Sequence, residues 1–194
     1  MDFERIQEIT KEVEEILSEN PKRFRHSLGV ADTAMCLAAC HGADIHNAYL
    51  AGILHDNAKY IDYDKQIFMC ENLGIEISDT ERRNPYLLHA KVGAYIASDR
   101  FGIKDLAVTE AIKWHTTGKP AMNKLEMIVF IADYIEPMRH KVSNLTHIRR
   151  LAFKDLEATV LQILGDTLAM LREKGRAIDS MTQKAYDYYK DKLS

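Results

Sequence analysis

Apolar residues recur at helical spacing along almost the whole chain, and no stretch shows the sustained apolar–polar alternation of a half-buried β-strand. In residues 3–18, for example, Ile6, Ile9 and Val13 fall on one face of a helix. Only four prolines and nine glycines interrupt the 194 residues, and most of them stand where a helix would end. The sequence therefore predicts an all-α fold, with one compact multi-helix domain over residues 1–194.

Residues that cap helices mark the expected borders. Asn20-Pro21 combines an N-cap residue with a first-turn proline. Asn123 and Glu126 resemble a capping box that opens a strongly apolar helix ending at Ile135. Ser180-x-x-Gln183 is expected to open the last helix. Further helices are expected over residues 22–40, 44–55, 62–73, 85–100, 105–115 and 147–174, with a polar loop over 75–84.

The composition argues against several classes of function. Hydrophobic residues make up 46% of the chain and charged residues 28%, as in soluble globular proteins. The formal net charge is −3, and no basic face carries interleaved aromatic residues, so neither nucleic acid nor an anionic membrane is expected as a partner. No apolar run reaches about 18 residues, and the amphipathic, acidic N-terminus does not resemble a signal peptide. We therefore expect a cytoplasmic protein.

Three cysteines fit a reducing compartment. Cys36 and Cys40 lie four residues apart on an expected helix, where they could share a metal ion. The chain has no second cysteine pair at zinc-site spacing, so the favoured interpretation is that both are small buried thiols that pack like alanine.

Six side chains that can bind metal ions lie in or beside apolar helical stretches, where an unpaired imidazole or carboxylate would be costly. They are His26, His55, Asp56, His89, His115 and Asp133. Each has a simpler explanation, because a histidine at a helix end is usually a cap or a satisfied core group, and Asp133 would be satisfied by Arg139 or Lys113. The joint pattern nevertheless favours a metal centre, and a binuclear one.

The chemistry of such a centre follows from its ligand types. Imidazole and carboxylate suit iron, manganese, cobalt, nickel or zinc, and the Asp56 carboxylate is the candidate to bridge two ions. Two ions can lower the pKa of a bound water toward about 7 and neutralise a phosphoryl group under attack. Lys59, Arg25 and Arg139 stand near the right segments to stabilise the developing negative charge. The residues thus predict a metallohydrolase.

The order His26…His55-Asp56…Asp133 resembles the HD-domain superfamily of metal-dependent phosphohydrolases. The fuller set of motifs, R-F-R-H-S-x-G-V, L-H-D-N-A-K, L-L-H-A, H-T-T-G and I-A-D-Y-I-E-P-x-R, resembles the YqeK-type family. Bacterial members of that family split diadenosine tetraphosphate symmetrically into two ADP. The likeness covers residues 20–140 and weakens afterwards, which leaves residues 146–194 as a helical C-terminal extension.

The resemblance implies a role for each matching residue. It implies that the six side chains above are metal ligands, that Asp56 and Lys59 are catalytic, and that metal-activated hydroxide attacks phosphorus. It implies two first-row metal ions, with iron favoured. The substrate contacts that it implies are Arg25, Lys59, His89, Thr116, Thr117, Gly118 and Arg139.

Several alternatives stay open. Family members tend to carry a His-Pro-x-Thr-like segment before the last helix, but residues 177–182 read Ala-Ile-Asp-Ser-Met-Thr. Glu136 is either part of the site or an ordinary helix-end carboxylate, Arg23 is favoured as a solvated residue, and Trp114 is favoured as a core residue over one that stacks on adenine. The same site also fits another substrate, such as a nucleoside phosphate, a cyclic nucleotide or an alarmone, or a non-catalytic regulatory module. A homodimer is left open.

Overall fold

The computed structural model describes residues 3–140 and 144–194 of the chain. The described residues are mostly helical and form no β-strand, which confirms the all-α prediction. The elements are α1 (Phe3–Ile16), α2 (Pro21–His41), α3 (Ile45–Leu54), α4 (Tyr63–Asn72), α5 (Asp79–Arg83), the 3₁₀ turn η1 (Pro85–Leu87), α6 (His89–Asp99), α7 (Leu106–Trp114), α8 (Lys124–Ile135), α9 (Leu145–Ala152), α10 (Leu156–Glu173) and α11 (Ser180–Lys192).

Two predicted helix starts are confirmed by their caps. The Asn20 side chain accepts a hydrogen bond from the Arg23 amide at the start of α2, with Pro21 in the first turn. At the start of α8, the Asn123 side chain accepts from the Glu126 amide, while the Glu126 carboxylate accepts from the Asn123 amide. These contacts are local in sequence, which is why the sequence alone predicted them.

Four predicted borders were wrong. Residues 75–84 contain α5, which begins at a capping box formed by Ser78 and Glu81. The predicted helix over 85–100 is split into η1 and α6. The predicted helix over 147–174 is two helices, because Asp155 caps α10 through the Ala158 amide and ends the continuity with α9. The last helix is capped by Asp179 rather than Ser180.

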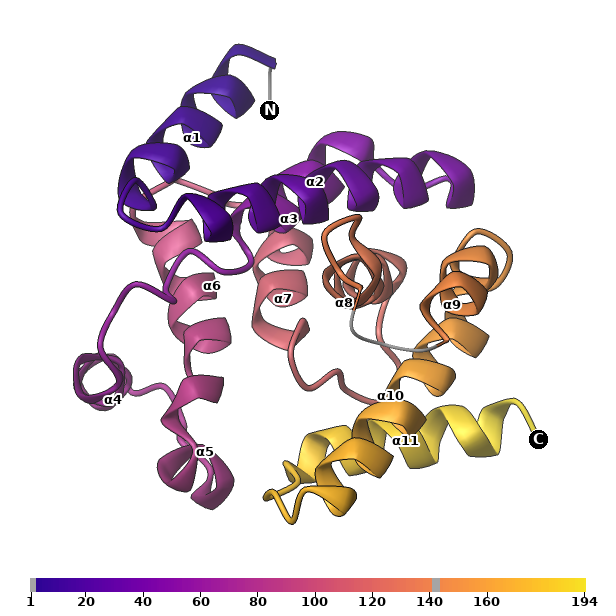
Figure 1. Cartoon of the computed structure of the whole chain (residues 1–194). Helices are drawn as coiled ribbons and strands as arrows, with labels where there is room; N and C mark the ends of the chain where they lie inside the picture. Colours follow the sequence, from indigo (N-terminus) through magenta and orange to yellow (C-terminus); the bar gives the residue numbers. More distant parts are fainter. Residues whose placement is uncertain (1–2, 141–143) are drawn as a thin grey trace.

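The helices that carry the site pack around one apolar core. α2 packs along α3 and α8, and α7 packs against α3, α6 and α8. Figure 1 shows α2 and α3 running across the view above α7 and α8, with α10 and α11 on the other side of these helices. Gly52 of α3 allows a close approach to α2, since a Cβ atom there would lie 2.6 Å from Ala31 Cα. Most residues of α8 are buried, as its continuous apolar sequence predicts.

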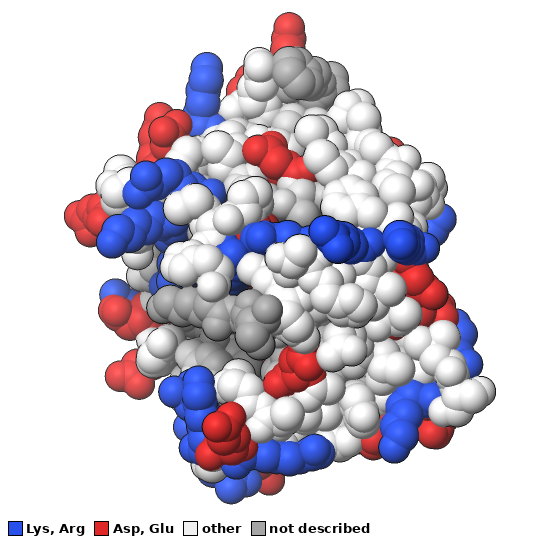
Figure 2. Space-filling view, turned by 45° about the vertical axis from the view of Figure 1, so that its right-hand side comes forward, with Lys and Arg blue, Asp and Glu red and all other residues white. Residues whose placement is uncertain are grey.

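The face of the molecule seen in Figure 2 carries charges of both signs. On the face seen in Figure 2, Lys and Arg form narrow bands separated by uncharged residues and interrupted by Asp and Glu. No described helix is both long and apolar enough to cross a membrane.

Candidate metal centre

All six predicted ligands converge from five helices. His26 lies within α2, His55 is the C-cap of α3 and is followed by Asp56, His89 begins α6, His115 is the C-cap of α7, and Asp133 lies in α8. Their ligand atoms form three overlapping triads, each with all atoms within 4.8 Å of one another. The triads are His26–His55–Asp56, His55–His115–Asp133 and Asp56–His89–His115.

Asp56 lies in the middle of this cluster. Its Oδ1 atom is 3.4 Å from His55 Nε2 and 3.4 Å from His89 Nε2. The same atom is 3.6 Å from His115 Nε2. On the other side, Asp133 Oδ1 is 3.0 Å from His26 Nε2 and 3.8 Å from His55 Nε2. Two carboxylates and four imidazoles therefore surround one small volume, and each carboxylate lies next to at least two imidazoles.

The imidazole tautomers show that this volume suits a cation. Nδ1 of His55, His89 and His115 each donates to the carbonyl oxygen three residues earlier, those of Gly52, Tyr86 and Ile112. A carbonyl only accepts, so each neutral ring presents an Nε2 lone pair to the cluster. Lone pairs then face carboxylate oxygens, and the buried His55 Nε2 has no hydrogen-bond partner. A cation bound between these acceptors would satisfy them, and the nitrogen and oxygen donor set fits first-row transition metals.

The pKa shifts of His55, His89 and the two carboxylates give the charge states that metal binding requires. Burial lowers the pKa of His55 and lowers that of His89 to about 4, so both rings are neutral near pH 7. Burial would raise the pKa of Asp56, but at the low pH where this carboxylate titrates the surrounding imidazoles are protonated, and their charge and hydrogen bonds, those of His55 first, hold the pKa well below its usual value. Asp133 behaves in the same way through the hydrogen bond that protonated His26 donates from Nε2. Both carboxylates are therefore ionised at neutral pH. Burial would lower the pKa of His26, but Asp133, Asp56 and Glu136 raise it, so a metal ion at Nε2 would have to displace that proton.

A cationic cavity of about 280 Å³ opens beside Asp56. Arg23 Nη1 lies 2.8 Å from Asp56 Oδ2, and Lys59 Nζ lies 2.9 Å from Asp56 Oδ1. Arg139 Nη2 lies 2.7 Å from Asp133 Oδ1. These cations point toward both carboxylates and leave part of their surface open to the cavity. The residues that line it are Asn20, Lys22, Arg23, His26, Asp56, Lys59 and Arg139.

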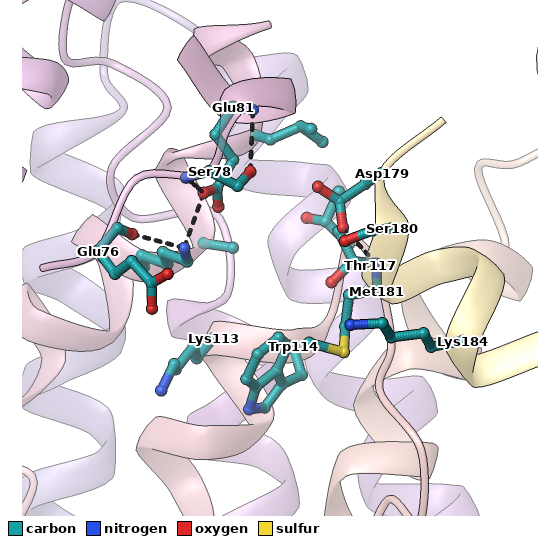
Figure 3. A pocket seen from close by; sticks show the side chains of 14 residues that line it. Glu76, Ser78, Glu81, Lys113, Trp114, Thr117, Asp179, Ser180, Met181 and Lys184 are labelled. Atoms are coloured by element: carbon teal, nitrogen blue, oxygen red, sulfur yellow. Dashed lines mark hydrogen bonds and ion pairs between the residues drawn. The ribbon is translucent and has the colours of Figure 1, made fainter. Parts of the chain in front are cut away.

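A second pocket, of about 240 Å³, adjoins the cluster through Thr116. Thr116 Oγ1 lies 3.1 Å from His115 Nε2 and 3.4 Å from His89 Nε2, and it also lines this pocket. Figure 3 shows Glu76, Ser78 and Glu81 facing Asp179, Ser180 and Met181 of the α11 start, with Trp114 between the two groups. The C-terminal extension thus supplies one wall of a pocket next to the cluster.

Some of the other predictions about the site need correction. Arg25 is exposed and does not line the cationic cavity, whereas Arg23, which we expected in solvent, pairs with Asp56. Gly118 is buried near Met122 and Phe130 and adopts a positive φ, so it shapes the turn and does not line the pocket. Thr117 does line it.

Three other expectations are also revised. Trp114 lines the second pocket instead of filling the core, and the C-terminal segment, in spite of its missing His-Pro, forms a pocket wall. The sequence signal for Arg23 was its position three residues before His26, which is one turn of α2.

Cys36 and Cys40 are exposed rather than buried, and all three cysteines are free.

Comparison with known proteins places these features in a class. Residues 23–138 match the family model described as HD domain, so fold and site define an HD-domain protein. A relative from Bacillus subtilis strain 168, named symmetrical bis(5'-nucleosyl)-tetraphosphatase, is 36% identical over 86% of this chain and 88% of its own length. A relative of the same name from Staphylococcus aureus strain NCTC 8325 is 39% identical over 87% of each chain. This chain belongs to that family of HD-domain symmetrical bis(5'-nucleosyl)-tetraphosphatases, which confirms the resemblance seen in the sequence.

A solved structure agrees with this assignment. A protein of known crystal structure from Clostridium acetobutylicum, described as a predicted HD superfamily hydrolase involved in NAD metabolism, is 38% identical in sequence. It superposes with a TM-score of 0.90 over 94% of this chain and 97% of that chain. The likeness therefore extends through the C-terminal helices, beyond the segment that the sequence motifs cover.

Proposed function

We propose that this protein hydrolyses diadenosine tetraphosphate to two ADP in a metal-dependent reaction. Water adds across the central P–O–P bridge, so that one product takes the hydroxyl oxygen and the other leaves as the second ADP. The observation that carries the proposal is the convergence of four imidazoles and two carboxylates beside a cavity lined by lysine and arginine. The names of the relatives supply the substrate.

The metal ions would be held by His26, His55, Asp56, His89, His115 and Asp133. We propose two ions, because the ligand atoms of the described residues that lie within 4.8 Å of one another form three overlapping triads, whereas six ligands of a single ion would form one group. Iron is the metal we favour, and manganese, cobalt, nickel and zinc accept the same donors. Ions bound there would supply Lewis acidity and lower the pKa of a coordinated water.

The chain's own cations would hold the phosphates. Lys59 and Arg23 both contact Asp56, and Arg139 contacts Asp133, so each cation lies at the edge of the ligand cluster. A polyphosphate entering the cavity would meet these three positive groups on one side, with charge-assisted hydrogen bonds as the main interaction. Lys59 is the residue we assign to stabilising charge on the attacked phosphate, while Asp56 fixes the position of Lys59.

One nucleoside would occupy the second pocket. Thr116 borders both this pocket and the ligand cluster, so a nucleotide with its phosphate at the cluster would extend its base toward Trp114. The Trp114 ring is suited to stacking on adenine, and its Nε1–H is already satisfied by Glu110 at 2.8 Å.

The free cysteines favour the cytoplasm as the working compartment.

The test is a product analysis with the metal-loaded protein. Protein loaded with iron, manganese or cobalt is incubated with diadenosine tetraphosphate, and the nucleotides are separated. We expect ADP as the only product. ATP together with AMP would contradict symmetrical cleavage, and absence of turnover with all three metals would contradict the proposed substrate. A panel of nucleoside phosphates, cyclic nucleotides and alarmones then identifies a better substrate.

A substitution ties this activity to the cluster. Asp56→Asn keeps the side-chain volume but removes the charge that four imidazoles, Lys59 and Arg23 surround, so kcat/KM should fall more than about 100-fold. Asp62→Asn is the matched control, because the Asp62 side chain lies in solvent and, within residues 3–140 and 144–194, pairs only with Lys65. Activity of Asp56→Asn equal to that of the control would show that the cluster is not the reaction site.

A further inference from the structure

Glu136 is a buried carboxylate directly behind one of the proposed metal ligands. It is the C-cap residue of α8 and is 1% exposed. Its Oε1 atom lies 3.1 Å from His26 Nδ1, and its Oε2 atom accepts a hydrogen bond from the Met138 amide. Both carboxylate oxygens are therefore used as acceptors, which an ordinary solvated helix-end glutamate would not show.

His26 needs this partner because of its place in the fold. The other three histidines stand at helix ends or beside the 3₁₀ turn, where each Nδ1–H reaches the carbonyl three residues earlier. His26 lies inside α2, whose carbonyl oxygens accept the hydrogen bonds of the helix itself. Glu136, 110 residues away in the sequence, is the acceptor that faces His26 Nδ1.

Gly29 makes room for the Glu136 carboxylate. A Cβ atom at position 29 would lie 2.9 Å from Glu136 Oε2, closer than nonbonded atoms pack. Glycine inside a helix such as α2 costs about 0.5–1 kcal/mol relative to alanine. The chain thus carries a helix-weakening residue at the point where Glu136 approaches His26.

We propose that Glu136 is a positioning residue for His26 and that Gly29 is the gap through which it reaches the ring. Glu136 accepts the Nδ1 proton and fixes ring orientation, which leaves Nε2 directed at the metal cluster. This inference rests on the metal centre of the proposed function. It adds a residue outside the six ligands whose effect is on metal affinity.

The first test compares two buried glutamates of the same helix. In Glu136→Gln, the amide NH₂ must face one of two donors, His26 Nδ1–H or the Met138 N–H, so one contact is lost. We expect the affinity for Mn²⁺, titrated into the metal-free protein and followed by electron paramagnetic resonance, to fall about 10-fold or more. Glu126→Gln is the control, because Glu126 is also 1% exposed in α8 but contacts Asn123 and Lys119 instead of a histidine.

The second test reaches the same contact from α2. Gly29→Ala changes no ligand, yet it should weaken Mn²⁺ binding because the new methyl group displaces Glu136. In a Glu136→Ala background the clash is gone, so Gly29→Ala should cause no further loss. Gly165→Ala is the control for a glycine inside a helix, since its Cβ would lie at an ordinary contact distance of 3.4 Å from Tyr186.

The outcomes separate this inference from the proposed function. If the unaltered protein binds no Mn²⁺, the metal centre and the role of Glu136 both fail. If it binds Mn²⁺ and Glu136→Gln binds equally well, only the role of Glu136 fails. The same conclusion follows if Gly29→Ala weakens binding equally in both backgrounds. Thermal unfolding of each metal-free variant, monitored by circular dichroism, shows that the compared proteins are folded.

Discussion

At the scale of single residues, Asp56 shows what keeps a charge inside this apolar core. The side chain is fully buried, and a buried carboxylate is costly unless it is paired. Arg23 and Lys59 pair with it from the cavity side, and the imidazoles of His26, His55, His89 and His115 also surround it. Removing one partner would leave the rest of this set uncompensated, which is why the carboxylate and its cations have to be considered as one unit.

The cysteines give a prediction at this scale. Burial raises the pKa of the Cys70 thiol to about 11, whereas Cys36 and Cys40 are exposed. The thiolate is the reactive form, and a raised pKa keeps Cys70 protonated up to that pH. At pH 8, a disulfide reagent such as Ellman's should therefore label two thiols of the folded protein, and three after unfolding in guanidinium chloride. Fast labelling of three thiols in the folded state would contradict the burial of Cys70.

At the scale of elements, the site depends on how closely two helices pack. α2 carries His26 and α3 ends at His55, and these two rings lie edge to face with centroids 5.2 Å apart. The close packing of α2 and α3 requires Gly52, because a methyl group there would meet the α2 backbone at Ala31. Backbone atoms, unlike the end of a flexible side chain, cannot move aside without shifting the helix.

Gly52→Ala should therefore lower the free energy of unfolding by about 1–3 kcal/mol, as overpacking does. Gly165→Ala, in α10, meets only the Tyr186 ring at contact distance and should be neutral or stabilising by about 0.5–1 kcal/mol. Urea unfolding of the two variants measures both values. If Gly52→Ala proved as stable as Gly165→Ala, α2 and α3 would not pack as closely as the structure shows.

At the scale of the whole molecule, the ligand cluster joins helices that are far apart in the sequence. Ligands come from α2, from α6, from α8 and from the ends of α3 and α7, so an ion bound by them would link most of the core. Binding to the folded state alone stabilises it by mass action. The C-terminal helices take part too, because Arg149 of α9 donates to the carbonyl oxygens of Ile135 and Glu136 at the end of α8.

Metal removal should therefore lower the thermal unfolding temperature. At a metal concentration about 1,000-fold above Kd, binding raises the free energy of unfolding by about 4 kcal/mol. For a chain of this size, that raises the unfolding temperature by roughly 10 °C. Differential scanning calorimetry before and after chelation and dialysis measures the shift. The Asp56→Asn variant should show a much smaller shift than the unaltered protein. Equal unfolding temperatures with and without metal would contradict a metal centre in the core.

The sequence by itself determined the helical class, the caps at Asn20 and Asn123, and the six polar side chains on apolar segments. These follow from periodicity and from contacts within three or four residues, which the order of residues specifies directly. Two of the missed helix starts had the same kind of local signal in the sequence. Ser78 and Glu81 form the capping box of α5, and Asp155 is the N-cap of α10.

Only the tertiary structure decided which charged residues meet the ligand cluster. Arg23 and Arg25 are two positions apart on α2, and the rotation of that helix against α3 and α8 turns Arg23 toward Asp56 and leaves Arg25 in solvent. The same holds for Glu136, whose contact with His26 spans 110 residues, and for the α11 start that lines the second pocket. Such contacts depend on how distant helices pack, and no local pattern encodes that packing.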